Sequence, residues 1–438
     1  ETDVESYDLN SRKGGGLFKR LTTKSVLYDG MIIQSKDGAL WQRIITDGYV
    51  YPEYIGWIES TGNDKAFLTK LFTIAGSLGL NISFSAENRF TIIGITNIDR
   101  RIKKIDAKGA KFVFDTDGKV RNGGFTYTQT TGGHFENFDI SYTDALRDYN
   151  VSGVKGESCG FWFESVNGVT VKNNKLNVTN AHGILVRMKN KAELDCVECY
   201  IADNVIDVHR LNPNDAKQGI LFDVEDSQTT AMDAYWQANK TVYESSKARH
   251  RNHVVIRNII TGCRYGVCIY YGEDCIVEYN KVTDCIRGYV QQNKCRRNKF
   301  RFNEVYEFKS AAFLLNYNTT QSIIEYNYGR STVVNGQAPL HISVQGEDNI
   351  CRFNTFDIES PEGAAWWMYC GIACSNNTFY KNVFRGKVKR AAVMVESAWT
   401  NNEDAIGSYG SQKSGSTYII KPTWGVGNTS GTVVQDNE

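Results

Sequence analysis

The chain has 438 residues, in which 50 lysines and arginines balance 49 acidic residues and leave a net charge of +1. This balance excludes the strongly basic surface typical of nucleic-acid-binding proteins, and no apolar run is long enough to span a membrane. Glycine is common, at 39 residues, and proline is scarce, at 5. That combination favours many strands joined by tight turns, because proline interrupts the hydrogen bonding of a strand.

Residues 1–60 are irregular, with Gly14-Gly15-Gly16 followed by short strand-like runs, and are interpreted as an irregular or connector segment. The chain starts at Glu1 without a methionine, which suggests that a preceding segment was removed. A helical pattern follows from Asp64 to Leu78, with apolar residues on one face and Gly79 to cap its end. We expect this helix to cover the open end of the next domain and to block edge-to-edge strand pairing.

A repeated asparagine marks the second half of the chain. The eight positions are Asn174, Asn204, Asn258, Asn280, Asn303, Asn327, Asn354 and Asn382. They lie 22 to 30 residues apart, except for one interval of 54. Such a period, stretched only by insertions, is the signature of a stacked solenoid. Apolar and polar residues alternate before each asparagine, as in a strand. The sequence therefore predicts an all-β fold, a parallel β-helix over residues 61–398.

The asparagines are expected to form a ladder at one turn of each coil. Asparagine tolerates the left-handed backbone conformation, and its amide can bond to the asparagine of the next coil. Asn137 is an earlier and poorer ladder position. We therefore predict left-handed geometry at the ladder asparagines themselves.

The 11 cysteines are interpreted as core residues. Cys196, Cys295 and Cys374 each lie eight residues before a ladder asparagine, so they are expected to fill the core as free thiols. Free thiols favour folding in a reducing cytoplasm. No pair has metal-site spacing and no cofactor motif is present, so neither a metal nor a cofactor is predicted. Five histidines are interpreted as surface or turn residues: His182, His209, His250, His253 and His341.

An insertion at about residues 224–250 includes Trp236. Insertions in a solenoid often emerge on the binding face, so Trp236 is a candidate substrate contact. The alternative is a surface excursion without a role. Residues 399–438 are rich in glycine, serine and threonine and are interpreted as a C-terminal cap or a subunit contact.

A second repeat places polar side chains on the outside of the coils. A glycine or alanine opens a strand in consecutive coils, and the residue four positions later is Glu164, Arg187, Asp223, Tyr270, Gln292 or Asn316. Because side chains alternate along a strand, these residues are expected to form a row on an outer face. Such a mixture suits a polysaccharide-binding groove. The four non-acidic members of the row are therefore candidate substrate contacts: Arg187, Tyr270, Gln292 and Asn316.

Three carboxylates on or beside this row are the candidate catalytic groups. Glu164 and Asp223 lie two coils apart, about 9 to 10 Å between backbones, and Asp223 and Glu225 share one strand face about 6.5 to 7 Å apart. Inverting glycosidases need roughly 6.5 to 9.5 Å between their carboxyl groups, and retaining ones about 5 Å. The spacing favours hydrolysis with inversion, with Arg187 keeping one acid ionised. A surface salt bridge without chemistry is the alternative.

Glu273 and Asp274 form a second acidic pair, and Glu347 and Asp348 repeat it in the same register. The repetition favours a structural turn. Glu273 and Asp274 are nevertheless alternative catalytic residues.

The order of these parts resembles the pectate-lyase-like tailspikes of bacteriophages. An irregular start with Gly14-Gly-Gly-Leu-Phe and Ala39-Leu-Trp-Gln-Arg precedes the helix and the asparagine-laddered coils. The resemblance implies a right-handed parallel β-helix that forms a homotrimer, and an exposed Trp366-Trp367 pair fits such an interface. It also implies binding and cleavage of bacterial capsule or O-antigen polysaccharide, and attachment to the phage baseplate or tail through a preceding segment. The site of action is then the virion tail, with no nucleic-acid partner and no membrane insertion.

Three functions stay open at this point. Hydrolysis of a surface glycan by paired carboxylates is the leading one. A polysaccharide lyase would need a uronate substrate and a histidine or tyrosine base. An adhesin would bind the glycan without cleaving it.

Overall fold

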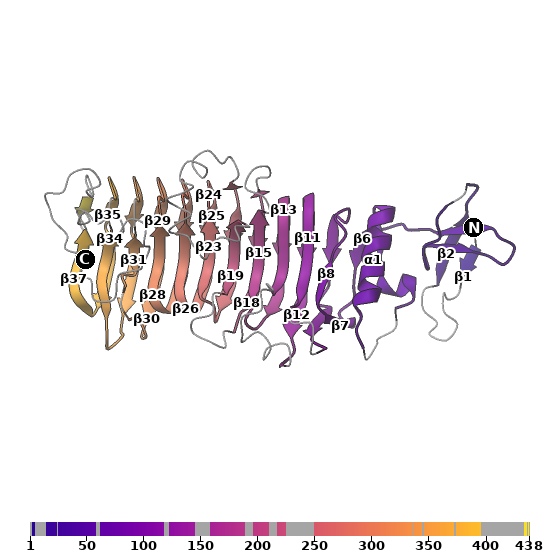
Figure 1. Cartoon of the computed structure of the whole chain (residues 1–438), viewed down its shortest axis with the longest axis horizontal. Helices are drawn as coiled ribbons and strands as arrows, with labels where there is room; N and C mark the ends of the chain where they lie inside the picture. Colours follow the sequence, from indigo (N-terminus) through magenta and orange to yellow (C-terminus); the bar gives the residue numbers. More distant parts are fainter. Residues whose placement is uncertain are drawn as a thin grey trace.

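The structure is a computed structural model that describes residues 2–4, 15–23, 25–57, 62–117, 122–144, 158–188, 196–209, 217–224, 249–335, 337–343, 346–371, 374–395, 433–435 and 437. The molecule is an elongated stack of coils with a small separate sheet at its N-terminal end (Figure 1). That antiparallel sheet has the order β1-β2-β4-β3, with β1 (Thr2–Val4), β2 (Gly16–Arg20), β3 (Ile32–Gln34) and β4 (Leu40–Arg43). The described part of residues 1–60, expected to be irregular with short strand-like runs, thus contains these four strands, the first strand of the β-helix, β5 (Tyr49–Val50), and the 3-10 helix η1 (Pro52–Ile55).

The remaining strands form one continuous ladder of parallel strands, which confirms the predicted right-handed parallel β-helix. Each coil contributes to three faces. Face A contains β8 (Ile95–Asn97), β11 (Gly124–Glu136), β13 (Cys159–Lys172), β15 (His182–Met188), β19 (Gln218–Val224), β23 (Tyr265–Tyr270), β26 (Lys281–Gln292), β28 (Glu304–Asn316), β31 (Leu340–Ile342), β34 (Ala364–Cys370) and β37 (Val388–Val395).

Face B contains β5 (Tyr49–Val50), β6 (Asn81–Ser83), β9 (Lys104–Asp106), β17 (Tyr200–Ala202), β21 (Val254–Ile256), β25 (Ile276–Glu278), β27 (Lys299–Arg301), β29 (Ile323–Glu325), β32 (Ile350–Arg352), β35 (Thr378–Tyr380) and β38 (Val433–Gln435), with the ends of β11 and β13. Face C contains β7 (Arg89–Ile93), β10 (Lys111–Asp115), β12 (Asp139–Tyr142), β14 (Lys175–Asn177), β18 (Val205–Asp207), β22 (Ile259–Thr261), β30 (Tyr328–Ser331), β33 (Thr355–Ile358) and β36 (Val383–Gly386), with the starts of β26 and β28. Short strands β16 (Cys196–Val197), β20 (His250–Arg251) and β24 (Gly272–Glu273) lie between faces A and B.

The interior is filled by the apolar residues of these alternating strands. In the first coils phenylalanine rings stack from coil to coil, with 5.3 Å between the ring centroids of Phe90 and Phe112. Later coils use aliphatic and cysteine side chains, such as Val277 and Cys295. All 11 cysteines are buried and free, so the predicted free thiols are confirmed.

The predicted capping helix is also confirmed. Helix α1 (Lys65–Leu78) lies across the first coils, between them and the N-terminal sheet (Figure 1). Its buried face includes Leu68, Leu71 and Phe72, which belong to the same core as the coils. Gly79 ends the helix with a left-handed backbone (φ 66°), as its position predicted. The helix thereby removes the apolar end of the solenoid from water.

The asparagine ladder is confirmed in detail between faces B and C. The side-chain Nδ2 of Asn280 donates to Oδ1 of Asn303 in the next coil (3.1 Å) and to the carbonyl oxygen of Val255 in the preceding coil (2.9 Å). The backbone N–H of Asn280 donates to the same Oδ1 (3.0 Å). The ladder continues from Asn382 to Asn437, one coil further than the sequence repeat indicated.

The predicted left-handed geometry belongs to a different residue. The residue before each ladder asparagine has the positive φ, for example Tyr279 (54°) and Phe302 (55°). The asparagine side chain must point inward to bond along the stack, so the preceding residue turns the corner. Asn137 is likewise a corner residue (φ 63°), and the backbone N–H of Phe138 donates to Asn174 in the ladder position.

These corners leave a row of aromatic rings on the outside of the β-helix. Tyr279, Phe302 and Tyr326 are exposed and stack with ring centroids 5.1 and 5.3 Å apart. The expectation of an exposed Trp366-Trp367 patch is wrong, because both rings are half-buried and Trp367 packs against the core. The exposed aromatic surface therefore lies at the corner between faces B and C.

Candidate functional site

The glycine-led strands place the predicted polar residues in register on face A. This polar row consists of Thr128, Glu164, Arg187, Asp223, Tyr270, Gln292 and Asn316. The glycines are needed because the coils approach closely there: a Cβ on Gly219 would lie 2.7 Å from the carbonyl oxygen of Gly266. The sequence repeat thus located six members, and the structure adds Thr128.

The polar row is less exposed than an open groove would be. Glu164 is 7% exposed and Gln292 is 5% exposed, against the expectation of a solvent-facing row. The cause lies two residues earlier on each strand, where apolar side chains form a second hydrophobic cluster outside the main core. Its members include Leu185, Leu221, Cys268, Val290 and Leu314, with Trp162 and Tyr270 partly buried against them. This apolar column keeps water away from the polar row beside it.

Arg187 and Asp223 form the central contact of the row. Nη2 of Arg187 lies 2.7 Å from Oδ2 of Asp223, and the guanidinium carbon lies 5.5 Å from the ring centroid of Trp162. Glu164 is next to Arg187 on the other side, on the neighbouring rung. Arg187 therefore lies between two acidic residues in register, and its guanidinium contacts Asp223 and lies beside an indole ring. Trp162 was not among the sequence candidates, although its place two residues before Glu164 indicated it.

Buried histidines support the backbone of Asp223. Nδ1 of His253 accepts a hydrogen bond from the backbone N–H of Cys199 (3.1 Å), so its Nε2–H donates to Nδ1 of His250 (3.2 Å). Nε2–H of His250 then donates to the carbonyl oxygen of Asp223 (2.8 Å). The interpretation of the histidines as surface residues is wrong for His182, His250, His253 and His341, which are buried. Their hydrogen bonds or ring contacts make burial tolerable, which the sequence does not reveal.

These histidines predict a loss of stability in mild acid. Burial lowers the pKa of His250 from 6.5 to about 4 and, with Arg287 nearby, that of His341 to about 3. Between pH 6.5 and these values the unfolded chain binds protons that the folded chain does not, so stability falls as the pH falls. For His250 the shift corresponds to roughly 3 kcal/mol.

We expect the melting temperature to fall between pH 6.5 and 4, and His341→Leu to make that fall shallower. Leucine suits the site because the residue in register on the preceding coil is Leu314. Thermal melts of both proteins across this range check the prediction. Equal pH dependence in the variant and the wild type would contradict it.

The alternative catalytic pair is part of an ion-pair network. Glu273 bonds Arg296 (2.7 Å) and contacts Arg297, and Asp274 bonds Arg297 (2.8 Å). Hydrogen bonds from Arg297 lower the pKa of Asp274. Isolated parallel β-bridges connect the backbone at Glu273 to that at Arg296, and the series continues into the later coils. The geometry is that of the structural turn that the repetition favoured.

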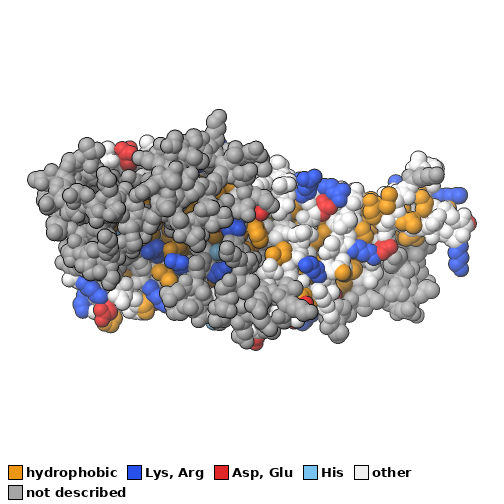
Figure 2. All heavy atoms as spheres, viewed as in Figure 1, with side chains coloured by type: hydrophobic (Ala, Val, Ile, Leu, Met, Phe, Trp, Pro, Cys, Tyr) orange, Lys and Arg blue, Asp and Glu red, His pale blue; other side chains and the backbone are white. Residues whose placement is uncertain are grey.

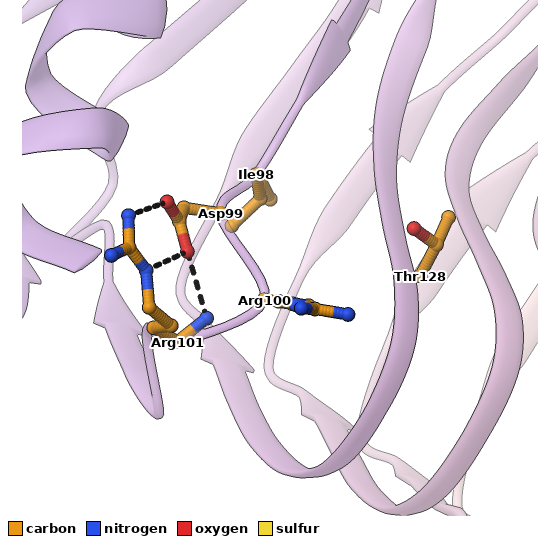
Figure 3. Close-up of a pocket in the computed structure, with 5 residues that line it drawn as sticks. All are labelled: Ile98, Asp99, Arg100, Arg101 and Thr128. Carbon is orange, nitrogen blue, oxygen red and sulfur yellow. Dashed lines mark hydrogen bonds and ion pairs between the residues drawn. The ribbon is translucent and has the colours of Figure 1, made fainter. Parts of the chain in front are cut away.

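A hollow of about 420 Å³ lies at the N-terminal end of the polar row. It is lined by Ile98, Asp99, Arg100, Arg101 and Thr128 (Figure 3). Arg101 is turned toward Asp99, with Nη2 2.6 Å from Oδ2, whereas Arg100 extends toward the strand that carries Thr128. Because Thr128 is in register with Glu164, the hollow continues the row. The remaining candidates, Glu225 and Trp236, lie outside the described residues.

Comparison with known proteins identifies the family. A family model described as periplasmic copper-binding protein (NosD) matches residues 197–429, just over half of the chain. The chain belongs to this NosD family. No curated protein matches the sequence. In the described part of the chain, no helix has the length and hydrophobicity needed to cross a bilayer.

Three solved structures are similar to this NosD-family chain in fold. Tailspike protein 2 of an Escherichia coli O157:H7 bacteriophage is 8% identical (TM-score 0.48), covering 99% of this chain and 52% of its own. The Streptococcus pneumoniae surface adhesin PfbA is 10% identical (TM-score 0.49), covering 88% and 100%. A lacto-N-biosidase of Eubacterium ramulus is 13% identical (TM-score 0.49), covering 82% and 62%. The chain thus spans about half of the tailspike's length, and the likeness concerns the fold alone.

The described residues do not fit the copper ion that the family description implies. Among them, no group of three or more histidine, cysteine or acidic side chains could hold a metal. The ring nitrogens of the closest pair, His250 and His253, already take part in the hydrogen bonds described above. Burial also raises the pKa of the Cys295 thiol to about 12, which opposes the thiolate that a metal would require.

Proposed function

We propose that this chain binds a bacterial surface polysaccharide along the polar row and hydrolyses it with Glu164 and Asp223. The observation that carries the proposal is the in-register sequence of Glu164, Arg187 and Asp223 on three successive rungs, beside Trp162. Two carboxylates separated by two rungs are about 9 to 10 Å apart at the backbone. That spacing leaves room for a water molecule, as inverting hydrolysis requires.

The two carboxylates have different surroundings and therefore different proposed roles. Asp223 is paired with Arg187, which favours its ionised form and suits a general base that activates water. Glu164 is the more buried of the two and is proposed as the general acid that protonates the leaving oxygen. Trp162 offers an apolar ring face for a sugar next to Arg187. Tyr270, Gln292 and Asn316 extend the binding surface along later rungs.

The finer form of the proposal is a phage tailspike that acts on capsule or O-antigen. It would be folded in the host cytoplasm, attached to the virion tail through a preceding segment, and active outside the cell as a homotrimer. The exposed rings of Tyr279, Phe302 and Tyr326 supply an apolar surface for subunit contact. Light scattering tests the assembly, because the mass of a single chain, 49.3 kDa, at micromolar concentration would contradict a trimer.

Binding without cleavage is a second candidate, favoured by the burial of the row. With Arg187 closed onto Asp223 and Glu164 only 7% exposed, the same residues could serve as a rigid recognition surface. The lyase alternative has less support, because burial, Cys268 and Asp223 raise the pKa of Tyr270 well above its usual value. Such a tyrosine resists the ionisation that a lyase base needs.

A panel of purified bacterial capsules and O-antigens tests the proposal. Each polymer is incubated with the purified chain, and its size is followed by gel filtration. We expect at least one polymer to fall to short oligosaccharides. If at least one polymer binds to the chain but every polymer in the panel keeps its full size, the chain is an adhesin and the proposed hydrolysis is overturned.

A further inference from the structure

A second group of basic residues lies on face A, with Arg264 just before β23 and Arg287 in the middle of β26, where that strand pairs with β23. Arg264 and Arg287 are half-buried, and both guanidinium groups lie over the ring of Tyr265, at 5.2 and 5.5 Å from its centroid. Nη1 of Arg287 also donates to the hydroxyl of Tyr265 (3.0 Å). Two adjacent coils therefore bring two guanidinium groups together over one tyrosine ring.

These arginines differ from the other arginines of the coils in their partners. Arg257 is paired with Asp203, Arg301 with Glu278, and Arg352 with Glu325. No carboxylate of the described residues pairs with Arg264 or Arg287. Among the residues that the structure describes, the two like charges thus share one aromatic ring without a counter-charge.

Two further observations show unused hydrogen-bonding capacity at this point. Nε of Arg287 is buried and has no hydrogen-bond partner in the described part of the chain. His341 is 8% exposed, its Nδ1 also has no partner, and it lies close enough to Arg287 for that charge to lower its pKa. Gln337 is nearby, with Oε1 2.7 Å from the hydroxyl of Ser310 and 3.5 Å from Nη2 of Arg287.

A group of this kind favours an anion. Partly desolvated guanidinium groups are destabilising until a counter-charge arrives, and they bind planar oxyanions through paired N–H donors. The outer surface of the same region is a mixture of basic, histidine and apolar side chains over β19 to β26, between the grey areas of Figure 2. Such a mixture matches a sugar ring that carries a carboxylate.

We propose that Arg264, Arg287 and Tyr265 form a subsite for the carboxylate of an acidic sugar, such as a uronate, in the polysaccharide. This inference rests on the proposed function and names its substrate class. Tyr265 and Tyr270 lie at opposite ends of β23, about 16 Å apart along the strand. The subsite is therefore remote from Glu164 and Asp223 and contributes binding, with the expected effect on KM and not on kcat.

The test compares uronate-containing capsules with the same polymers after chemical reduction of their carboxylates to alcohols. Equilibrium binding and cleavage are measured for the wild type and for Arg264→Gln with Arg287→Gln in one chain. We expect carboxyl reduction and the double substitution each to weaken binding about tenfold or more, because hydrogen bonds to charged groups are worth that much. The double variant should bind the reduced polymer no more weakly than the wild type does.

Arg330→Gln is the matched control, since Arg330 is exposed and paired with Glu359 on face C. It should bind every polymer as the wild type does. Equal binding of native and reduced polymers, or an unchanged double variant, would overturn the subsite while leaving hydrolysis intact. Carboxylate-dependent binding without cleavage of any polymer would instead support the subsite and overturn the proposed hydrolysis. Melting curves of the double variant exclude loss of folding as the cause.

Discussion

Asp223→Asn is expected to slow polysaccharide cleavage by at least about a hundredfold, the range of one lost general base. Asparagine keeps the size of the side chain and can accept a hydrogen bond from Arg187, but it cannot take a proton from water. Glu164→Gln should cause a loss of the same order, because the leaving oxygen then lacks its acid. Initial rates and binding are measured separately, and binding should change little in both variants.

Asp203→Asn is the control for these substitutions. Asp203 also pairs with an arginine, Arg257, at 2.7 Å, but it lies at the corner between faces B and C, away from the polar row. It should leave cleavage unchanged. Arg187→Ala should reduce turnover as well as binding, because Arg187 contacts Asp223 directly. Wild-type cleavage rates for both Asp223→Asn and Glu164→Gln would show that the catalytic residues do not lie in the polar row.

Asn280→Leu is expected to destabilise the fold by about 3 kcal/mol or more. Leucine leaves the carbonyl oxygen of Val255 and the N–H groups of Asn258 without their partners inside the stack. Each buried polar group left unsatisfied costs about 1 to 3 kcal/mol. The neighbouring coils cannot relax independently, because each pairs with the next along the ladder.

Urea unfolding followed by circular dichroism measures this loss. Lys299→Leu is the matched control, because Lys299 is exposed on β27 and receives the same new side chain without losing a buried hydrogen bond. It should change stability by less than about 0.5 kcal/mol. Similar midpoints for Asn280→Leu and the wild type would show that the ladder contributes little to stability.

The architecture could be predicted because its physical cause repeats in the sequence. Each coil needs the same asparagine at the same turn, and each close approach on face A needs a glycine or an alanine, so both patterns recur at the coil period. The corner residues escaped prediction because their positive φ is adopted by tyrosine, phenylalanine and arginine alike. The geometry of the neighbouring asparagine imposes that conformation, so the residue type at the corner does not indicate its positive φ.

The site could be predicted only in part, for a similar reason. Register placed Glu164, Arg187 and Asp223 on successive rungs, because strand alternation and the glycine repeat are enough to fix it. Burial could not be derived, since it depends on the apolar column beside the row. The group of Arg264 and Arg287 was missed although each lies one or two residues before a strand glycine, because only the structure shows that neither pairs with a carboxylate of the described residues.

The most direct test of the central claim is product analysis in water labelled with oxygen-18. A capsule that the chain degrades is cleaved in labelled water, and the oligosaccharides are analysed by mass spectrometry. Hydrolysis by Glu164 and Asp223 predicts one heavy oxygen at each new reducing end, and at least about a hundredfold fewer such ends from Asp223→Asn in the same time. Unlabelled products with the ultraviolet absorbance of an unsaturated sugar would contradict the account and show a lyase.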